Sequence, residues 1–334
     1  MNFSIGGSVQ VGAGFPRTMT LMPDPTEMVI TCGFAAALGI FVIAAVIRLA
    51  LARRSVDLPA DWIAHDHASQ DRSLFHASGG ELDRTAAPPG LPVGRVPVWF
   101  YRPYDLVGAG FVFLVFCGLV LASFRITDDA RGEVDSAGLL VSIGFQFVMG
   151  GVVAMLVVMR VGWNSWLGLK WPSWQWVFAI APCAVLFMWA VVGGLQISGY
   201  VKWMESFGVE TVQDTVQLLQ KAEDPVILGL MGFAAMIAAP LCEEVVFRGY
   251  FYPVLKKFGG AWPAAICSAL LFACAHGNLA VLLPLFIFGG VLVFIYEKTG
   301  SLWAPIAVHF CFNSATVVIQ MVVRQFPHLL ETSP

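Results

Sequence analysis

The segment CEEVVFRGY, residues 242–250, places two carboxylates and an arginine in a stretch of the chain that is otherwise uncharged. An ionisable side chain inside a membrane costs a few kcal/mol at least and usually marks a functional site. Helix positions four apart share a face, so Glu244 and Arg248 are expected to pair. Glu243 is turned by about 100° from Glu244 and by about 140° from Arg248. The pattern therefore predicts one neutralised carboxylate and one free carboxylate, and a purely structural ion-pair cluster is the alternative.

Two histidines lie in apolar segments that follow the glutamates. His276 occurs in FACAHGN, with Phe272 four residues before it, and His309 occurs in APIAVHFCFNS, with Asn313 four residues after it. At a rise of 1.5 Å per residue, both histidines and Glu243 are expected at a similar depth in the membrane. A carboxylate, two imidazoles and a carboxamide that converge supply the base, proton carriers and oxyanion donors of a hydrolytic site. The alternative is that each histidine is a packing residue.

The composition is that of an all-α, polytopic integral membrane helical bundle. Of 334 residues, 58% are hydrophobic and 12% are charged, and the mean hydropathy is +0.76. Soluble domains are about 45–50% apolar and about 25% charged. Because a spanning helix needs about 20 apolar residues, we expect about eight transmembrane helices, of which the sixth is short enough to end inside the membrane. The segments are 28–51, 106–124, 138–159, 174–197, 226–250, 262–276, 279–296 and 302–323.

The hydropathy pattern divides the chain into five parts. Residues 1–27 form an N-terminal tail without the pattern of a cleaved signal peptide. The other parts are N-terminal transmembrane helices, an amphipathic extramembrane segment, a transmembrane core that carries the candidate catalytic residues and a C-terminal tail, at 28–197, 198–225, 226–323 and 324–334.

A polar loop at 52–105 interrupts the first part and is expected to be a flexible linker, since it is rich in Asp, Ser, Pro and Gly. Its His65, His67 and His76 lie close together, and a solvated loop is favoured over a metal site. The sequence WFYRPYD at its end is typical of an interfacial aromatic belt.

Within the extramembrane part, valines and a leucine recur at helical spacing between polar residues, at Val209, Val212, Val216 and Leu219. This pattern predicts an amphipathic helix on the outer membrane surface. A loop helix that covers the bundle is the alternative.

Charge and cysteine usage exclude other classes and give an orientation. The net charge of −3 and the scattered basic residues exclude a nucleic-acid-binding patch. The positive-inside rule is met best with both the N-terminus and the C-terminus outside, in the cell membrane if the source is bacterial. All seven cysteines lie in or beside apolar runs and are expected to be small buried hydrophobes, not a disulfide framework. They are Cys32, Cys117, Cys183, Cys242, Cys267, Cys274 and Cys311.

Three motifs stand in a set order on apolar segments: EEVVFR, FACAH and HFCFN. Together they resemble the CPBP family of intramembrane proteases, also called the ABI family, which includes the type II CAAX prenyl endopeptidases (Rce1-like). The resemblance covers about residues 226–323. It implies that Glu243 and His276 activate a water molecule, and that His309 and Asn313 stabilise the oxyanion. The supporting motif positions are Glu244, Arg248 and Phe272.

The resemblance implies an intramembrane endopeptidase that cleaves a peptide bond near the membrane, in a peptide or a prenylated protein. No metal is expected to be required. The alternative is a zinc site formed by Glu243, His276 and His309 with one open position. Two rival functions are a non-catalytic immunity or scaffold protein of the same fold and a proton- or ion-coupled transporter. The transporter predicts inverted repeats, which the sequence does not display.

Overall fold

The computed structural model describes residues 24–56, 96–98, 100–125, 135–207, 209, 218–220 and 222–326, without the side chains of 52–56. Within these residues the chain is helical and contains no strand, so the predicted fold class is confirmed. The elements are α1 (Pro25–Val56), α3 (Pro103–Ser123), α4 (Ser136–Val158), α5 (Trp163–Leu167), η2 (Trp174–Trp176), α6 (Val177–Ile197), α7 (Tyr200–Glu205), α9 (Pro225–Phe233), η3 (Ala234–Ala238), α10 (Ala239–Glu244), η4 (Val245–Phe251), α11 (Tyr252–Gly259), α12 (Ala261–Cys274), α13 (Leu282–Thr299) and α14 (Trp303–Gln325).

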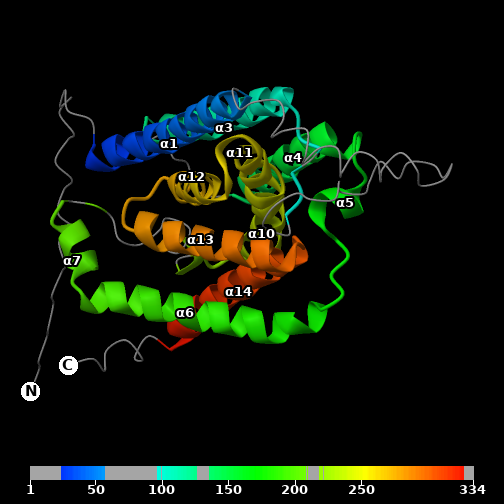
Figure 1. The fold of residues 1–334 in the computed structure, drawn as a ribbon. Coiled ribbons are helices and arrows are strands. Elements are labelled where there is room, and N and C mark those ends of the chain that lie inside the picture. The colour runs from blue at the N-terminus through cyan, green and yellow to red at the C-terminus, as the bar shows by residue number, and fades with distance from the viewer. Residues whose placement is uncertain are drawn as a thin grey trace, which may run out of the picture.

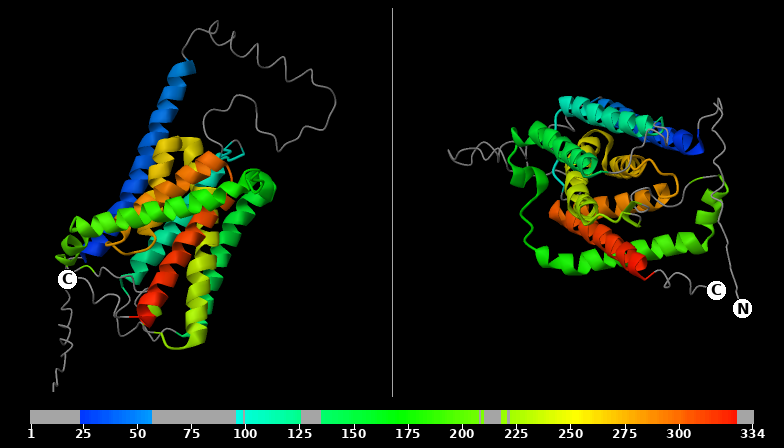
Figure 2. Two further views of the ribbon diagram at one scale, coloured as in Figure 1. Left: turned by 90° about the horizontal axis from the view of Figure 1, so that it is seen from below. Right: turned by 180° about the vertical axis from the view of Figure 1, so that it is seen from behind.

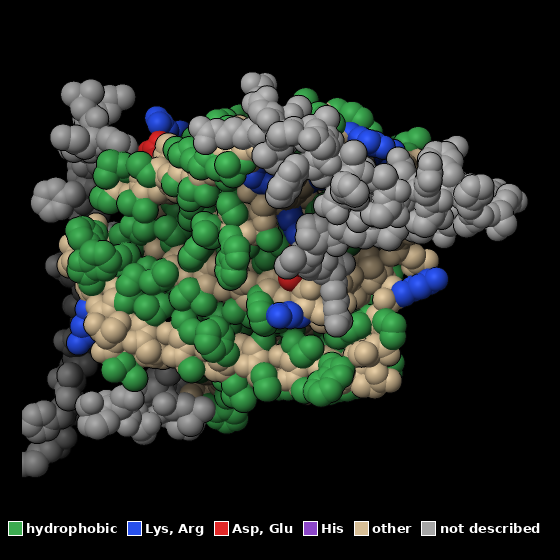
Figure 3. Space-filling view, viewed as in Figure 1, with side chains coloured by type: hydrophobic (Ala, Val, Ile, Leu, Met, Phe, Trp, Pro, Cys, Tyr) green, Lys and Arg blue, Asp and Glu red, His purple; other side chains and the backbone are tan. Residues whose placement is uncertain are grey.

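Seven helices in the described part of the chain are long and apolar enough to cross a membrane. One of them is the continuous run from Pro225 to Gly259, which includes α9, η3, α10, η4 and α11. The remaining apolar helix, α12, has 14 residues and is too short to span by itself, as expected. The chain is therefore a multi-pass membrane protein. Figure 3 shows hydrophobic side chains spread over one face of the bundle, with few charged groups among them.

Several helices begin with residues that favour a helix start. Pro103 and Pro225 occupy the first turn of α3 and α9, where a missing N–H costs nothing. Asp135 and Asp224 cap α4 and α9, and their carboxylates accept hydrogen bonds from the backbone N–H groups of Gly138 and Val226, each at 2.8 Å. The boundaries of these spans thus follow from local sequence.

The short helix α12 occupies the centre of the bundle and packs against α1, α11 and α13 (Figure 1). Helix α14 packs between α6 and the run of η3 and α10, while α4 packs along α9, α10 and η4. Two further views show α6 crossing one side of the bundle, next to α14 (Figure 2). The three motif segments therefore come from α10 and η4, the end of α12, and α14.

Glycine allows α12 and α13 to approach closely. A Cβ atom on Gly289 of α13 would lie 2.9 Å from the Cα atom of Ala269 on α12, which is closer than real side chains permit. The contact also brings the carbonyl of Gly289 within reach of the interior of the bundle, where Arg248 binds it. Helix packing and the position of the arginine thus depend on the same glycine.

The span that carries the glutamates contains two π-helical segments, η3 and η4, on either side of α10. A π-turn shifts hydrogen bonding from the fourth to the fifth residue and occurs frequently at functional sites. Two prolines, Pro240 and Pro253, lie in the same span and remove two further backbone donors. Backbone carbonyls in this span are consequently available to side chains of other helices.

The interpretation of WFYRPYD as an aromatic belt is wrong for most of the described segment. Tyr104 is 58% exposed, as a belt requires, but Phe100 and Tyr101 are buried in the core. Asp105 is buried as well, because Arg160 binds both of its carboxylate oxygens. Helix α3 begins at Pro103, so the last residues of the predicted 52–105 loop belong to the bundle.

The described cysteines are all free, as expected. Cys242, Cys267 and Cys274 are buried, but Cys32 and Cys183 are exposed on the surfaces of α1 and α6. Those two lie on outward-facing sides of helices that can span the membrane, so they are not part of the protein core.

Several predictions fall wholly or largely outside the described residues. These are the tail before residue 24, the loop between 57 and 95 with its three histidines, and the segment 210–217. Val209 and Leu219, at the edges of that last segment, are both buried. The amphipathic helix itself stays a prediction.

Candidate active site

Glu244 and Arg248 form the ion pair expected from their spacing. Arg248 Nη1 lies 2.8 Å from Glu244 Oε1, and both side chains are fully buried. Arg248 Nη2 donates to the carbonyl of Gly289 on α13 at 3.2 Å. Breaking a buried pair leaves an uncompensated charge, so these contacts fix both side chains in place.

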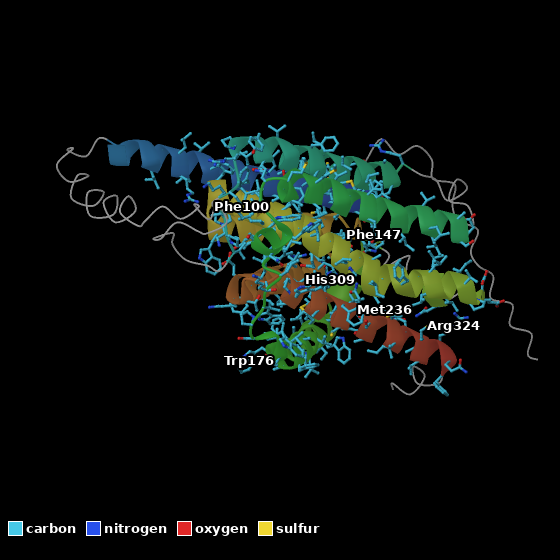
Figure 4. The ribbon with its side chains drawn as sticks, turned by 90° about the vertical axis from the view of Figure 1, so that its right-hand side faces the viewer. Phe100, Phe147, Trp176, Met236, His309 and Arg324 are labelled. Carbon is cyan, nitrogen blue, oxygen red and sulfur yellow. The ribbon has the colours of Figure 1, made fainter. Side chains whose placement is uncertain are left out.

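His309 lies between the two glutamates. Its Nδ1 atom is 2.9 Å from Glu244 Oε1, and its Nε2 atom is 4.0 Å from Glu243 Oε2. Figure 4 places His309 in the interior of the bundle. Phe100 and Trp176 lie towards one end of the molecule in this view, and Arg324 lies towards the other end. Since an ionised carboxylate only accepts hydrogen bonds, Nδ1 carries a proton and Nε2 faces Glu243.

Glu243 differs from its neighbour in its surroundings. Its side chain is 24% exposed, whereas the side chain of Glu244 is fully buried. Among the described side chains, Glu243 Oε2 has no hydrogen-bond partner. The distance of 4.0 Å to His309 exceeds a direct hydrogen bond.

His276 stands just beyond the end of α12, where the chain turns. Its Nδ1 atom is 2.8 Å from the carbonyl of Phe272. A carbonyl accepts only, so Nδ1 carries the proton and Nε2 of the neutral ring is left as a basic nitrogen. Gly277 follows with a φ of 62°, and the side chain of Asn278 accepts from the N–H of Ala280 at 2.9 Å. These two residues form the turn that holds His276 at this point.

The ring of Phe272 joins the three motif segments. The Arg248 guanidinium lies 4.4 Å from its centroid, and the rings of His276 and His309 lie 5.0 and 5.8 Å from it. Phe288 of α13 adds a contact to His309 at 5.3 Å. Both imidazoles are therefore held against one buried aromatic side chain.

Asn313 lies one turn beyond His309 on α14 and contacts η3. Its Nδ2 atom donates to the carbonyl of Ala235 at 2.8 Å. The usual donor to this carbonyl, the N–H of Ala239, bonds instead to Ala234 because the segment is π-helical. The carboxamide has a second N–H, which this bond leaves available.

Burial divides the candidate residues into two groups. Glu244, Arg248, Phe272 and His309 are buried, and Glu243, His276 and Asn313 are partly or fully exposed. Solvent therefore reaches Glu243, His276 and Asn313 but not the other four side chains.

Zinc was the alternative for Glu243, His276 and His309. No three His, Cys, Asp or Glu side chains are grouped to hold a metal ion anywhere in the part of the chain that the structure describes. His65, His67 and His76 lie outside that part. The expectation that no metal is required stays a prediction.

Sequence reasoning placed the motif residues on their elements and identified the Glu244–Arg248 pair. It missed the bond between His309 and Glu244, the contact of Asn313 with Ala235, and the π-helical segments. A helical wheel cannot find contacts between elements that are distant in sequence. Pro240 and Pro253 were the signals that this span departs from a regular helix.

Apolar spanning helices that enclose buried carboxylate, guanidinium and imidazole groups define a polytopic membrane protein with an intramembrane polar site. Residues 225–315 match the family model described as Type II CAAX prenyl endopeptidase Rce1-like, which confirms the resemblance drawn from the motifs. The chain is also 24% identical over 204 residues to a protein of Bacillus subtilis (strain 168) named "Putative membrane peptidase YdiL". That match covers 58% of this chain and 78% of the relative.

No solved structure matches the chain. At the level of the family, the two sequence matches support an intramembrane protease.

Proposed function

We propose that this protein is an intramembrane endopeptidase whose attacking water is activated by Glu243 and His276. The observation that carries the proposal is the placement of Glu243: its side chain is partly exposed, and its Oε2 atom, which has no hydrogen-bond partner among the described side chains, lies 4.0 Å from a histidine that a second glutamate holds in position. The family match and the name of the Bacillus subtilis relative agree with this class.

The first step is the activation of water. Glu243 accepts a proton from the water while His276 Nε2 accepts a hydrogen bond from it, and the water oxygen forms a bond to the carbonyl carbon of the scissile peptide. His276 suits this role because its Nδ1–H is committed to the Phe272 carbonyl, which leaves Nε2 free to accept. The same proton is then delivered to the leaving amine as the C–N bond breaks.

The second requirement is stabilisation of the tetrahedral oxyanion. His309 can donate from Nε2 only as an imidazolium, because Nδ1–H already points at Glu244. Glu244 holds the ring in this orientation by accepting from Nδ1. The second N–H of Asn313 is the other donor. No step in this mechanism requires a metal.

The substrate class that we propose is a peptide or a prenylated protein that reaches the site from the lipid bilayer. Membrane peptides from cells with the wild-type protein should be compared by mass spectrometry with those from cells with the Glu243→Gln variant. The proposal expects fragments that only the wild type produces, and the purified wild-type protein should cleave the corresponding synthetic peptide. Identical peptide profiles, with no cleavage by the purified protein, would contradict it.

The rival functions predict other results. A non-catalytic scaffold would keep its cellular role after Glu243→Gln. A proton-coupled transporter would accumulate solute in proteoliposomes without any cleavage.

We also propose that both termini lie outside the cytoplasm, since the Lys and Arg distribution favours this orientation. Reporter fusions at each end test it, and a cytoplasmic C-terminus would contradict it.

A further inference from the structure

The backbone carbonyl of Gly249 lies directly after Arg248 and lacks its usual helical donor. In an α-helix, the N–H four residues further on would bind it, and that residue is Pro253, which has no N–H. A carbonyl oxygen has two lone pairs, and the loss of the α-helical donor gives side chains access to this one. Side chains of other elements can therefore hold the glutamate-bearing helix by donating hydrogen bonds to the carbonyl of Gly249.

Two side chains from other parts of the chain donate to this carbonyl. Tyr101 donates its hydroxyl to Gly249 O at 2.7 Å, and Trp166 donates from Nε1 at 2.8 Å. Trp166 Nε1 also lies 3.1 Å from the Tyr101 hydroxyl. Both side chains are almost completely buried. Bonds in such surroundings have fixed geometry, because no water competes for the donors.

Helix α5, which carries Trp166, also holds the beginning of α14. The carbonyl of Leu167 accepts from the N–H of Leu302 at 2.9 Å. The next residue, Gly168, has a φ of 60°, and a Cβ atom there would lie 1.9 Å from the carbonyl oxygen of Gly300. Only glycine fits such an approach. One short segment thus contacts both η4 and the turn before α14.

We propose that Trp166 and Tyr101 are positioning residues that set the rotation of the glutamate-bearing helix relative to His309. They act on the reaction assigned under the proposed function, and neither touches the reacting atoms. Gly249 lies between one and two turns beyond Glu244 and Glu243, and Leu302 lies about two turns before His309. A shift at the shared contact therefore changes the 4.0 Å separation between Glu243 and His309. Displacements of about 1 Å change rates by about 100-fold.

The test removes one donor at a time and keeps the rings. Tyr101→Phe deletes the hydroxyl, and Trp166→Phe deletes Nε1–H. Matched controls are Tyr104→Phe and Trp163→Phe, since these residues are 58% and 50% exposed and lie in the same two segments. The full-length protein in detergent is compared for kcat, for KM and for hydrogen exchange of peptides that cover 245–251 and 303–309.

Each donor variant should lower kcat about 10- to 100-fold with little change in KM, and exchange should rise in both peptides. The controls should match the wild type in both readouts.

If Trp166→Phe fails to fold, Tyr101→Phe carries the test, because it retains the tryptophan donor. Unchanged exchange, or a rise in KM with kcat unchanged, would overturn the proposal. A wild-type protein that cleaves nothing would overturn the proposed function instead, while exchange would still decide whether these residues hold the two helices.

Discussion

His309 and Glu244, which are 65 positions apart in the sequence, are joined by a buried contact of 2.9 Å between Nδ1 and Oε1. The same glutamate oxygen accepts from Arg248 at 2.8 Å. Glu244 therefore has two partners, the arginine of the first motif and the histidine of the third. This contact fixes His309 with its second nitrogen towards Glu243, so the two adjacent glutamates face different nitrogens of one ring.

Single removal of either partner in the buried pair should destabilise the protein. Glu244→Ala and Arg248→Ala each leave an uncompensated charge, at a cost of about 3–5 kcal/mol. Both variants should melt at a lower temperature than the wild type in the same detergent and should lose activity. The double variant Glu244→Leu with Arg248→Met should recover part of the lost stability, because no lone charge remains. Single variants that melt like the wild type would refute a stabilising role for the pair.

The two histidines should respond differently to alanine. His276 is exposed, so His276→Ala should change the melting temperature little. The variant should abolish cleavage, because His276 is proposed to activate the attacking water. His309 is buried against Glu244, Phe272 and Phe288, so His309→Ala should lower both kcat and the melting temperature. Cleavage assays and thermal melts of the two variants, measured side by side, check this. Normal cleavage by His276→Ala would remove it from the mechanism.

Chelation should leave cleavage unchanged. The described His, Cys, Asp and Glu side chains include no three-ligand group, and the proposed mechanism uses side chains alone. Purified protein should be treated with a strong zinc chelator, analysed for bound metal and assayed for peptide cleavage. Loss of activity that stoichiometric zinc restores would contradict the proposed mechanism and support the zinc set of Glu243, His276 and His309.

Much of the fold follows from hydropathy alone, since seven spans and the short α12 lie where apolar runs predict them. Spacing also predicts the Glu244–Arg248 pair, because positions four apart meet on any regular helix. Contacts between elements that are distant in the sequence cannot be predicted from hydropathy or from helical spacing. Tyr101, in a segment that resembles an interfacial belt, is buried and donates to the carbonyl of Gly249, whose α-helical donor is removed by Pro253. Composition gives the same signal for a lipid-facing and a core-facing tyrosine.

The central claim is that Glu243 activates the water and Glu244 holds His309 and Arg248, and a comparison of their glutamine variants tests it most directly. Peptide cleavage and melting temperature should be measured for wild type, Glu243→Gln and Glu244→Gln in one detergent. Glu243→Gln should fold and melt like the wild type, bind substrate and cleave nothing, because glutamine cannot accept the proton. Glu244→Gln should melt at a lower temperature. Normal cleavage by Glu243→Gln, beside an equally stable but inactive Glu244→Gln, would contradict the account.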